Sequence, residues 1–345
     1  MRTFHSCLPL SRSRRPWIAT ILFAFASFAA VASGEVKSSL VATDTGKIYF
    51  NSAKKDATYF QLYKHTAVFD DAIWGDLRFP SNMTTDKVPV MVVMHGSAGV
   101  TKSVYAWVEY LNSMGVATFM IDSFTPRGIN RTVEDQSQLN PSATTADALL
   151  ALKLLATHPR IDTSKIGIIG FSKGGTGALT ASFERLRSAV VPGDLKYALH
   201  IPFYGGCTQY AKTTDAPILM FAGTGDAYHT TAECQKNVNS LKSKGANLKF
   251  VVYEGALHGF DTGNPHSYVP HGQTWIKCTD QMDMDSMKSY LHGETSVTPP
   301  AEVRDYRKSC MSLGLAVGGD DEYRERSRKE VKDFLTQNFG IGSKK

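Results

Sequence analysis

A serine flanked by glycines is the strongest chemical feature of the sequence. Ser172 lies in the sequence G-F-S-K-G-G at 170–175, directly after an apolar segment at 165–169. Glycines on both sides permit a sharp turn between a strand and a helix, because they have no Cβ to clash. Such a turn exposes the hydroxyl at a helix N-terminus, where developing negative charge is stabilised. The alternatives are an ordinary glycine-rich turn or a phosphate loop, but the G-x-x-x-x-G-K-S/T pattern is absent.

An acid and a base that can activate this serine follow it along the chain. A serine hydroxyl is a weak nucleophile until a histidine takes its proton, and a carboxylate must orient that histidine. Asp226 and His258 each come shortly after an expected strand. The sequence therefore predicts Ser172 as nucleophile, His258 as base and Asp226 as orienting acid. A helix-capping role for Asp226, a surface-loop role for His258, and His229 as the base are the alternatives.

Two backbone N–H groups are expected to stabilise the oxyanion of a tetrahedral intermediate. Lys173, the residue after the serine, supplies one of them. The other is expected in the sequence H-G-S-A-G at 95–99, where small residues let the main chain approach a substrate. Ser97 N–H is the predicted donor, and Ala98 N–H is the alternative.

Apolar segments alternate with segments of helical periodicity over most of the chain. Strands are expected at 47–50, 72–79, 88–94, 116–121, 165–169, 198–204, 218–222 and 248–253, and helices at 103–114, 144–157, 173–183, 230–243 and 324–339. This alternation predicts an α/β fold with a mostly parallel central sheet and helices on both faces. The short connections favour one domain, and the pattern breaks down only in an insertion at about 261–313.

The composition limits the classes of protein to consider. The chain has 345 residues, of which 42% are hydrophobic and 20% charged, and this excludes a disordered chain, a coiled coil and a polytopic membrane protein. The net charge of +6 would suit a nucleic-acid partner. Four of the six excess charges are arginines within residues 1–32, which contain no acid, so +2 remains for the rest. We therefore expect no nucleic-acid partner.

Residues 1–32 are typical of a secretory signal peptide. Arginines precede an apolar stretch at 18–32 that ends in A-V-A. Cleavage is expected after Ala32 or after Gly34; the alternative is an uncleaved anchor, although this stretch is shorter than the roughly 20 residues of a membrane span. The sequence S-R-R-P-W-I at 13–18 also matches a twin-arginine export motif. We expect an exported protein, periplasmic or extracellular, with a single domain at 33–345 and no membrane span.

Cysteine usage is consistent with export. Four cysteines follow the leader, an even number that allows two disulfides in three connectivities in an oxidising compartment: Cys207, Cys234, Cys278 and Cys310. We expect Cys207–Cys234 and Cys278–Cys310, because each pair flanks one contiguous segment; buried free thiols are the alternative. No C-x-x-C motif or Cys/His cluster indicates a metal site.

Taken in order, these motifs resemble those of the dienelactone hydrolase family of α/β hydrolases. The resemblance runs from about residue 72 to 259 and resumes in the C-terminal helix. It rests on H-G-S-A-G at 95–99, D-S-F-T-P-R-G at 122–128, the serine motif, G-T-G-D at 223–226 and H-G-F at 258–260. The order serine, acid, histidine is that of α/β hydrolases. The resemblance implies hydrolysis of a small-molecule ester or lactone through an acyl-enzyme, with no cofactor.

Two positions depart from the family pattern. Founding members of the family carry a cysteine nucleophile where this chain has Ser172, and a glutamate where it has Gly96. Both changes argue against dienelactone itself as the substrate. The alternatives to an esterase are a peptidase or an acyltransferase with the same triad, or a catalytically silent binding protein with the same fold.

Two further hypotheses concern the substrate. The segment at 261–313 is expected to fold over the site entrance, with an ordinary surface excursion as the alternative. In the first case, an acyl pocket would be lined by Tyr268, Trp275, Met282, Met284 and Met287. Arg127 is a candidate for binding a substrate carboxylate, with a structural salt bridge as the alternative.

Overall fold

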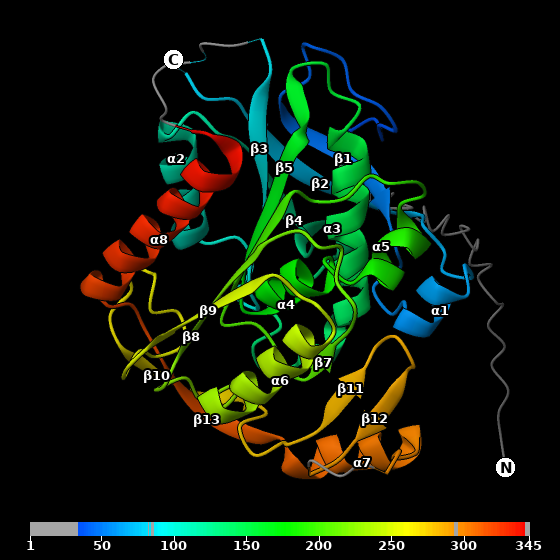
Figure 1. Cartoon of the computed structure of the whole chain (residues 1–345), viewed down its shortest axis with the longest axis vertical. Helices are drawn as coiled ribbons and strands as arrows, with labels where there is room; N and C mark the ends of the chain where they lie inside the picture. Colours follow the sequence, from blue (N-terminus) through cyan, green and yellow to red (C-terminus); the bar gives the residue numbers. More distant parts are fainter. Residues whose placement is uncertain (1–33, 82, 84–85, 293–295, 342–345) are drawn as a thin grey trace, which may run out of the picture. The chain divides into compact units, whose positions relative to one another are not determined.

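An eight-stranded sheet organises the part of the chain that the computed structural model describes, residues 34–81, 83, 86–292 and 296–341 (Figure 1). Its strands are, in spatial order, β1 (Gly46–Ser52), β2 (Asp71–Arg78), β4 (Ala117–Asp122), β3 (Val88–Met94), β5 (Ile161–Phe171), β6 (Leu199–Phe203), β8 (Ile218–Gly223) and β9 (Leu248–Tyr253). β2 pairs antiparallel with β1 and β4, and all other neighbours are parallel. The prediction of a mostly parallel sheet is confirmed. The predicted signal peptide lies outside the described residues.

Helices cover both faces of the sheet, as predicted. The helices on one face are α2 (Lys102–Ser113) and α8 (Asp321–Phe339), and those on the other include α3 (Pro141–Leu155), α4 (Lys173–Thr180), α5 (Glu184–Val190) and α6 (Thr231–Ser243) (Figure 1). The helix predicted at 173–183 ends at Thr180, and α5 is a separate helix that begins at Glu184. A short helix, α1 (Tyr59–Tyr63), also packs on the second face.

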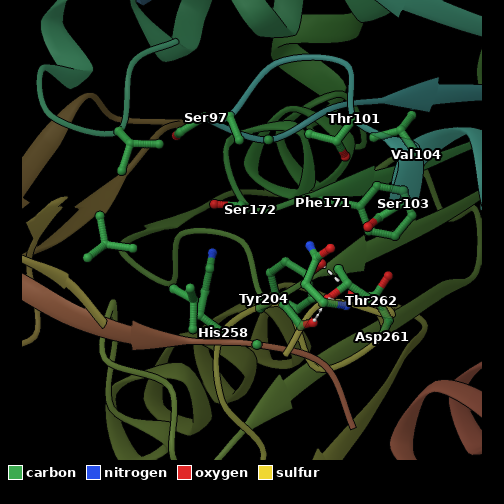
Figure 2. A pocket seen from close by; sticks show the side chains of 18 of the residues that line it. Ser97, Thr101, Ser103, Val104, Phe171, Ser172, Tyr204, His258, Asp261 and Thr262 are labelled. Atoms are coloured by element: carbon green, nitrogen blue, oxygen red, sulfur yellow. Dashed lines mark hydrogen bonds between the residues drawn. The ribbon is translucent and has the colours of Figure 1, made fainter. Parts of the chain in front are cut away.

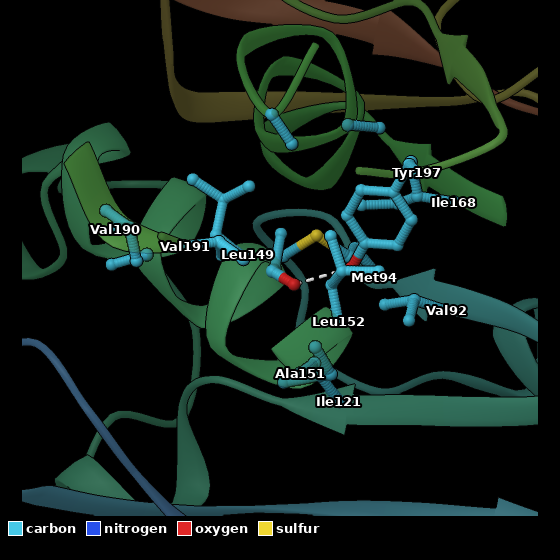
Figure 3. Packing of buried hydrophobic residues seen from close by; sticks show 14 of the residues in the cluster. Val92, Met94, Ile121, Leu149, Ala151, Leu152, Ile168, Val190, Val191 and Tyr197 are labelled. Carbon is cyan, nitrogen blue, oxygen red and sulfur yellow. Dashed lines mark hydrogen bonds between the residues drawn. The ribbon is translucent and has the colours of Figure 1, made fainter. Parts of the chain in front are cut away.

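The central strand β3 shows why the sheet is buried on both sides. All its residues except Pro89 are apolar and buried. Because side chains alternate along a strand, Val90, Val92 and Met94 pack in one core, whereas Met91 and Val93 pack in the other. Figure 3 shows the first core, in which leucines of α3 pack over this strand. A continuous apolar run thus specified a strand with a layer of helices on either side.

The ends of the helices follow local capping chemistry. A left-handed residue, Gly115 at φ 81°, ends α2, and Val116 N–H donates to Leu111 O. The Asp320 side chain accepts hydrogen bonds from two N–H groups of the first turn of α8. This cap starts the helix at Asp321, three residues before the predicted start.

The insertion at 261–313 contains regular structure that the sequence pattern did not reveal. It forms β10 (Ser267–Thr274), β11 (Gln281–Asp283), β12 (Lys288–Tyr290), α7 (Pro300–Cys310) and the start of β13 (Ser312–Val317). β10 pairs with β13, and β11 lies between β12 and β7 (Gln209–Tyr210). The elements are short, and α7 buries only Cys310, so no sustained hydrophobic period exists to detect.

Two disulfides join the predicted pairs. Cys207 is bonded to Cys234 and Cys278 to Cys310. The first links the segment after β6 to α6, and the second closes the insertion between β10 and the end of α7. The predicted connectivity is confirmed.

Removal of the second bridge by the double variant Cys278→Ala/Cys310→Ala tests its contribution. The bridge closes a loop of 32 residues, so its loss is expected to lower the free energy of unfolding by up to about 4 kcal/mol through the entropy of the unfolded chain. Urea denaturation measures this difference. Peptide mapping of the non-reduced wild type shows which cysteines are bonded to each other. A disulfide that joins a cysteine of one pair to a cysteine of the other, or four free thiols, would contradict the structure.

Candidate active site

Ser172 occupies the sharp turn that the sequence predicts between β5 and α4. Its backbone lies at φ 54° and ψ −115°, a conformation that residues other than glycine rarely adopt. Ser172 N–H donates to Phe203 O at 3.0 Å, and Ser172 O accepts from Thr176 N–H at 2.9 Å. The turn is therefore tied both to the neighbouring strand and to the first turn of the helix.

The glycines around Ser172 are required by close packing of the backbone. A Cβ at Gly170 would lie 2.1 Å from Gly174 O, and a Cβ at Gly174 would lie 2.4 Å from Met94 O. Both distances are shorter than any real contact of a Cβ atom, and backbone atoms cannot move aside easily. The glycines thus allow α4 to start directly against the end of β3, which also positions the next loop.

Asp226 and His258 are brought together as the sequence predicts. His258 Nδ1 donates to Asp226 Oδ2 at 2.7 Å, and both side chains are about nine-tenths buried. The other oxygen of Asp226 accepts from Tyr228 N–H at 2.7 Å. With Nδ1 engaged, Nε2 is the free nitrogen of the imidazole, and in Figure 2 the ring of His258 and the hydroxyl of Ser172 point toward one another. No hydrogen bond joins these two described side chains, and such contacts often tighten only when substrate binds.

The histidine loop is held from a second side by the end of β13. Gly318 N–H donates to His258 O at 3.0 Å, and His258 forms an isolated bridge with Val317. By contrast, His229, the alternative base, does not line the pocket that contains Ser172. The geometry thus favours His258 over His229.

The loop at 95–99 lies against the serine, where a second oxyanion donor is expected. A Cβ added to Gly96 would lie 3.2 Å from Ser172 Cβ, and both Ser97 and Ala98 line the pocket. Ser97 is fixed by two contacts, because its O accepts from Thr132 N–H at 2.8 Å and its Oγ donates to Gln136 Oε1 at 3.0 Å. Lys173 N–H is the first amide of α4, directly after the serine.

The side chain of Lys173 binds the loop that contains Gln136, the partner of Ser97. Its Nζ donates to Gln136 O at 3.3 Å and to Leu139 O at 2.9 Å. Burial lowers the pKa of Lys173 to about 8, and the distant charge of Asp135 offsets only part of this effect. One residue after the nucleophile, a buried amine therefore anchors the loop whose Gln136 holds Ser97.

Arg127 is buried in ion pairs outside the pocket, and this placement does not support its hypothesised role in binding a substrate carboxylate. Its side chain is 2% exposed and lies outside the pocket. All five of its N–H groups donate within the protein: two go to the oxygens of Asp147 at 2.8 Å, and the others go to Asp71, Ser123 O and Ala53 O. The salt-bridge interpretation is therefore the one that the structure supports.

The pocket around Ser172 and His258 has a volume of about 500 Å³. The insertion contributes to its wall through Ser267 and Val269, which line it together with Leu315 and Val317 of β13. The residues expected to line an acyl pocket do not line this one. Tyr268 is 67% exposed, and Met284 is buried in the hydrophobic core that also contains residues of α4, α5 and α6. Trp275, Met282 and Met287 are likewise absent from the lining. That part of the hypothesis is wrong, since strand alternation turns Tyr268 away from its neighbours.

Sequence reasoning missed an aromatic and acidic wall beside His258. Tyr204, Tyr228, Trp107 and Asp261 all line the pocket. Two signals were available: Tyr204 ends an expected strand at 198–204, and Asp261 follows His258 by three residues. The carboxyl ends of parallel strands meet at one edge, so Tyr204 was a candidate by the rule that selected Asp226.

The described residues contain no group of His, Cys, Asp and Glu side chains placed to hold a metal ion. In the same part of the chain, no helix has the length and apolar character that a membrane crossing requires.

The sheet order, the turn after β5 and the pocket at the carboxyl ends of the strands define an α/β-hydrolase fold. Residues 77–283 match the model of the dienelactone hydrolase family, and the chain belongs to that family.

Individual relatives are distant. The chain is 28% identical over 174 residues to the non-reducing polyketide synthase stbA of Stachybotrys bisbyi; this stretch is 48% of the chain but 7% of that protein. It is 22% identical over 208 residues to a probable 2-oxo-3-(5-oxofuran-2-ylidene)propanoate lactonase of Bradyrhizobium, covering 54% of this chain and 79% of the relative. Among solved structures, Thermogutta terrifontis esterase 2 phosphoramylated by tabun aligns over 85% of this chain and 97% of its own, with a TM-score of 0.51 and 14% identity. This likeness supports the fold.

The lowered pKa of Lys173 predicts a specific pH dependence of stability. Between pH 8 and about 10.5 the unfolded chain binds a proton at this lysine that the native state does not. The free energy of unfolding of the wild type, measured relative to Lys173→Met, should therefore rise with pH in this window, by up to about 1.4 kcal/mol per pH unit. Urea denaturation at several pH values from 7 to 9.5 measures it.

The matched control is Lys242→Met on the exposed side of α6. Its difference from the wild type should not change with pH. A pH-independent difference for Lys173→Met as well would contradict a buried amine at this position.

Proposed function

We propose that the protein is a serine hydrolase that cleaves carboxylic esters or lactones through Ser172, His258 and Asp226. The observation that carries the proposal is the 2.7 Å hydrogen bond between His258 and Asp226 beside a serine held in a strained turn. Membership of the dienelactone hydrolase family supports the hydrolase class. The similarity to a probable lactonase supports lactones among the substrates.

In the first half of the reaction, Ser172 Oγ attacks the carbonyl carbon of the substrate, and its proton passes to His258 Nε2. Asp226 holds the imidazole through Nδ1 and stabilises the positive charge that forms on the ring. The N–H groups of Ser97 and Lys173 donate to the oxyanion of the tetrahedral intermediate. The intermediate collapses when the carbon–oxygen bond to the alcohol breaks, and the leaving oxygen takes the proton from His258.

In the second half, a water molecule gives its proton to His258 as it attacks the acyl-enzyme. Collapse of the second tetrahedral intermediate returns the proton to Ser172 Oγ and releases the carboxylic acid. For a lactone, the alcohol and the acid are parts of one molecule, so the ring-opened hydroxy acid is released. Apart from the substrate and this water molecule, the steps use only groups of the chain, and none of them is an oxidation or a reduction.

Export is a second part of the proposal. Two disulfides support it, because such bridges persist in oxidising compartments and are rare in the reducing cytosol. The leader predicted at 1–32 is consistent with the same destination.

Hydrolysis of a short p-nitrophenyl ester by the wild type and by Ser172→Ala tests the function. Without the nucleophile, kcat is expected to fall by about 10³-fold or more. The matched control is Ser188→Ala on the exposed face of α5, which should leave the rate unchanged.

Three results would count against the proposal. An inactive wild type would favour a silent binding protein, and full activity in Ser172→Ala would exclude this nucleophile. Turnover of peptide bonds or transfer to an added alcohol in preference to water would favour the peptidase or acyltransferase alternatives.

A further inference from the structure

Two aromatic rings contact the imidazole of His258. Tyr204 contacts it edge to face, with ring centroids 4.6 Å apart and an interplanar angle of 62°. Tyr228 also contacts it, with centroids 4.2 Å apart and an interplanar angle of 43°. The position of Nε2 therefore depends on how firmly the two tyrosines are held.

Tyr204 is held in a backbone conformation that a bulky residue rarely adopts. Its φ is 36°, although it follows β6 directly and is 7% exposed. Tyr204 N–H donates to Phe221 O at 2.8 Å, which joins its backbone to β8. Strain of this kind persists only where the surroundings impose it, and it gathers at functional sites. The conformation directs the Tyr204 side chain to His258 rather than along the strand.

A buried carboxylate fixes the far end of Tyr204. Tyr204 Oη donates to Asp261 Oδ1 at 2.5 Å, and Trp107 Nε1 donates to Asp261 Oδ2 at 2.6 Å. Asp261 is 3% exposed, and burial raises its pKa even though both donors favour the charged form. Among the described residues no lysine or arginine forms an ion pair with it. Asp261 thus holds the side chains of Tyr204 and Trp107 in fixed positions, although burying its carboxylate costs solvation energy.

The three side chains come from parts of the fold that are far apart in the sequence. Trp107 belongs to α2, Tyr204 follows β6, and Asp261 lies in the tight turn after His258, where Gly259 has a φ of 82°. Figure 2 shows Tyr204 between His258 and Asp261. Tyr204 thus contacts the histidine loop at two points. Its ring packs against the imidazole of His258, and its hydroxyl donates to Asp261 three residues later.

We propose that Asp261 and Tyr204 are positioning residues for His258. Trp107 holds Asp261, Asp261 holds the hydroxyl of Tyr204, and the ring of Tyr204 keeps Nε2 of the imidazole aimed at Ser172 while Nδ1 stays on Asp226. This inference rests on the proposed hydrolase function for its kinetic consequence, but the orientation of the ring can be measured without turnover.

Tyr204→Phe removes one hydroxyl and leaves the ring, so it tests the proposal with little risk to the fold. A misplaced base slows chemistry without weakening substrate binding, so kcat should fall by about 10–100-fold with KM little changed. Asp261→Asn should also lower kcat, because an amide nitrogen cannot accept the proton of the Tyr204 hydroxyl, which must turn to accept a hydrogen bond instead. Since the two residues act as one unit, the double variant should be no slower than the slower single variant.

The matched control is Tyr253→Phe. Tyr253 is a buried tyrosine of the same core, and its hydroxyl has no hydrogen-bond partner within the described residues. Its loss should leave kcat unchanged. The groups around His258 and Tyr204 are unchanged in this control: Asp226, Tyr228 and Asp261.

A second readout separates this proposal from the proposed function. The Nδ1–H proton of His258 should give a downfield NMR signal in the wild type, assigned by its loss in Asp226→Asn. The signal should broaden or shift in Tyr204→Phe and in Asp261→Asn but not in Tyr253→Phe. This result would support the positioning role even if the wild type hydrolysed no ester. Lack of ester hydrolysis would refute the hydrolase function but not the positioning role.

Two outcomes overturn the positioning role. One is an unchanged signal together with an unchanged kcat in Tyr204→Phe. The other is a rise in KM at constant kcat, which would mean that Asp261 and Tyr204 bind substrate rather than orient the base.

Discussion

The backbone of Ser172 imposes the constraint on which the rest of the site depends. At φ 54° and ψ −115° it carries strain of about 1–3 kcal/mol, and only close packing around the turn can hold it there. The carbonyls of Met94 and Gly174 approach so closely that Gly170 and Gly174 admit no side chain. The same packing places the loop after β3 against the serine. One local constraint thus aligns the hydroxyl, the start of α4 and the expected oxyanion donors.

His258, the proposed base, is held by elements that lie far from the serine in sequence. Asp226 from the end of β8 accepts a hydrogen bond from the imidazole, and the end of β13 holds the backbone of His258 through Gly318. Through β10 and β13, the insertion and the strand that follows it also supply Val269, Leu315 and Val317 to the pocket wall. A segment without recognisable periodicity therefore contributes to the pocket wall, and its bridge from Cys278 to Cys310 closes the part that contains β11, β12 and α7.

The parts that sequence reasoning predicted correctly are those with strong local signals. Buried strands such as β3 read as apolar runs, and the turn at Ser172 needs glycines that the sequence displays directly. The order of the motifs then placed Asp226 and His258 at neighbouring strand ends. Arg127 and the wall formed by Tyr204 and Asp261 could not be assigned in this way. Their roles depend on partners 20 to 154 residues distant, such as Asp147 and Trp107, which no local pattern identifies.

The central claim is that Ser172 is an activated nucleophile, and covalent labelling by an organophosphate such as paraoxon tests it without knowledge of the natural substrate. Because attack on phosphorus needs the same serine and base as attack on a carbonyl, mass spectrometry should find one phosphoryl adduct per chain, on the peptide that contains Ser172. Labelling should be much slower in His258→Ala. An adduct on another residue, or no adduct on folded wild-type protein, would contradict the account.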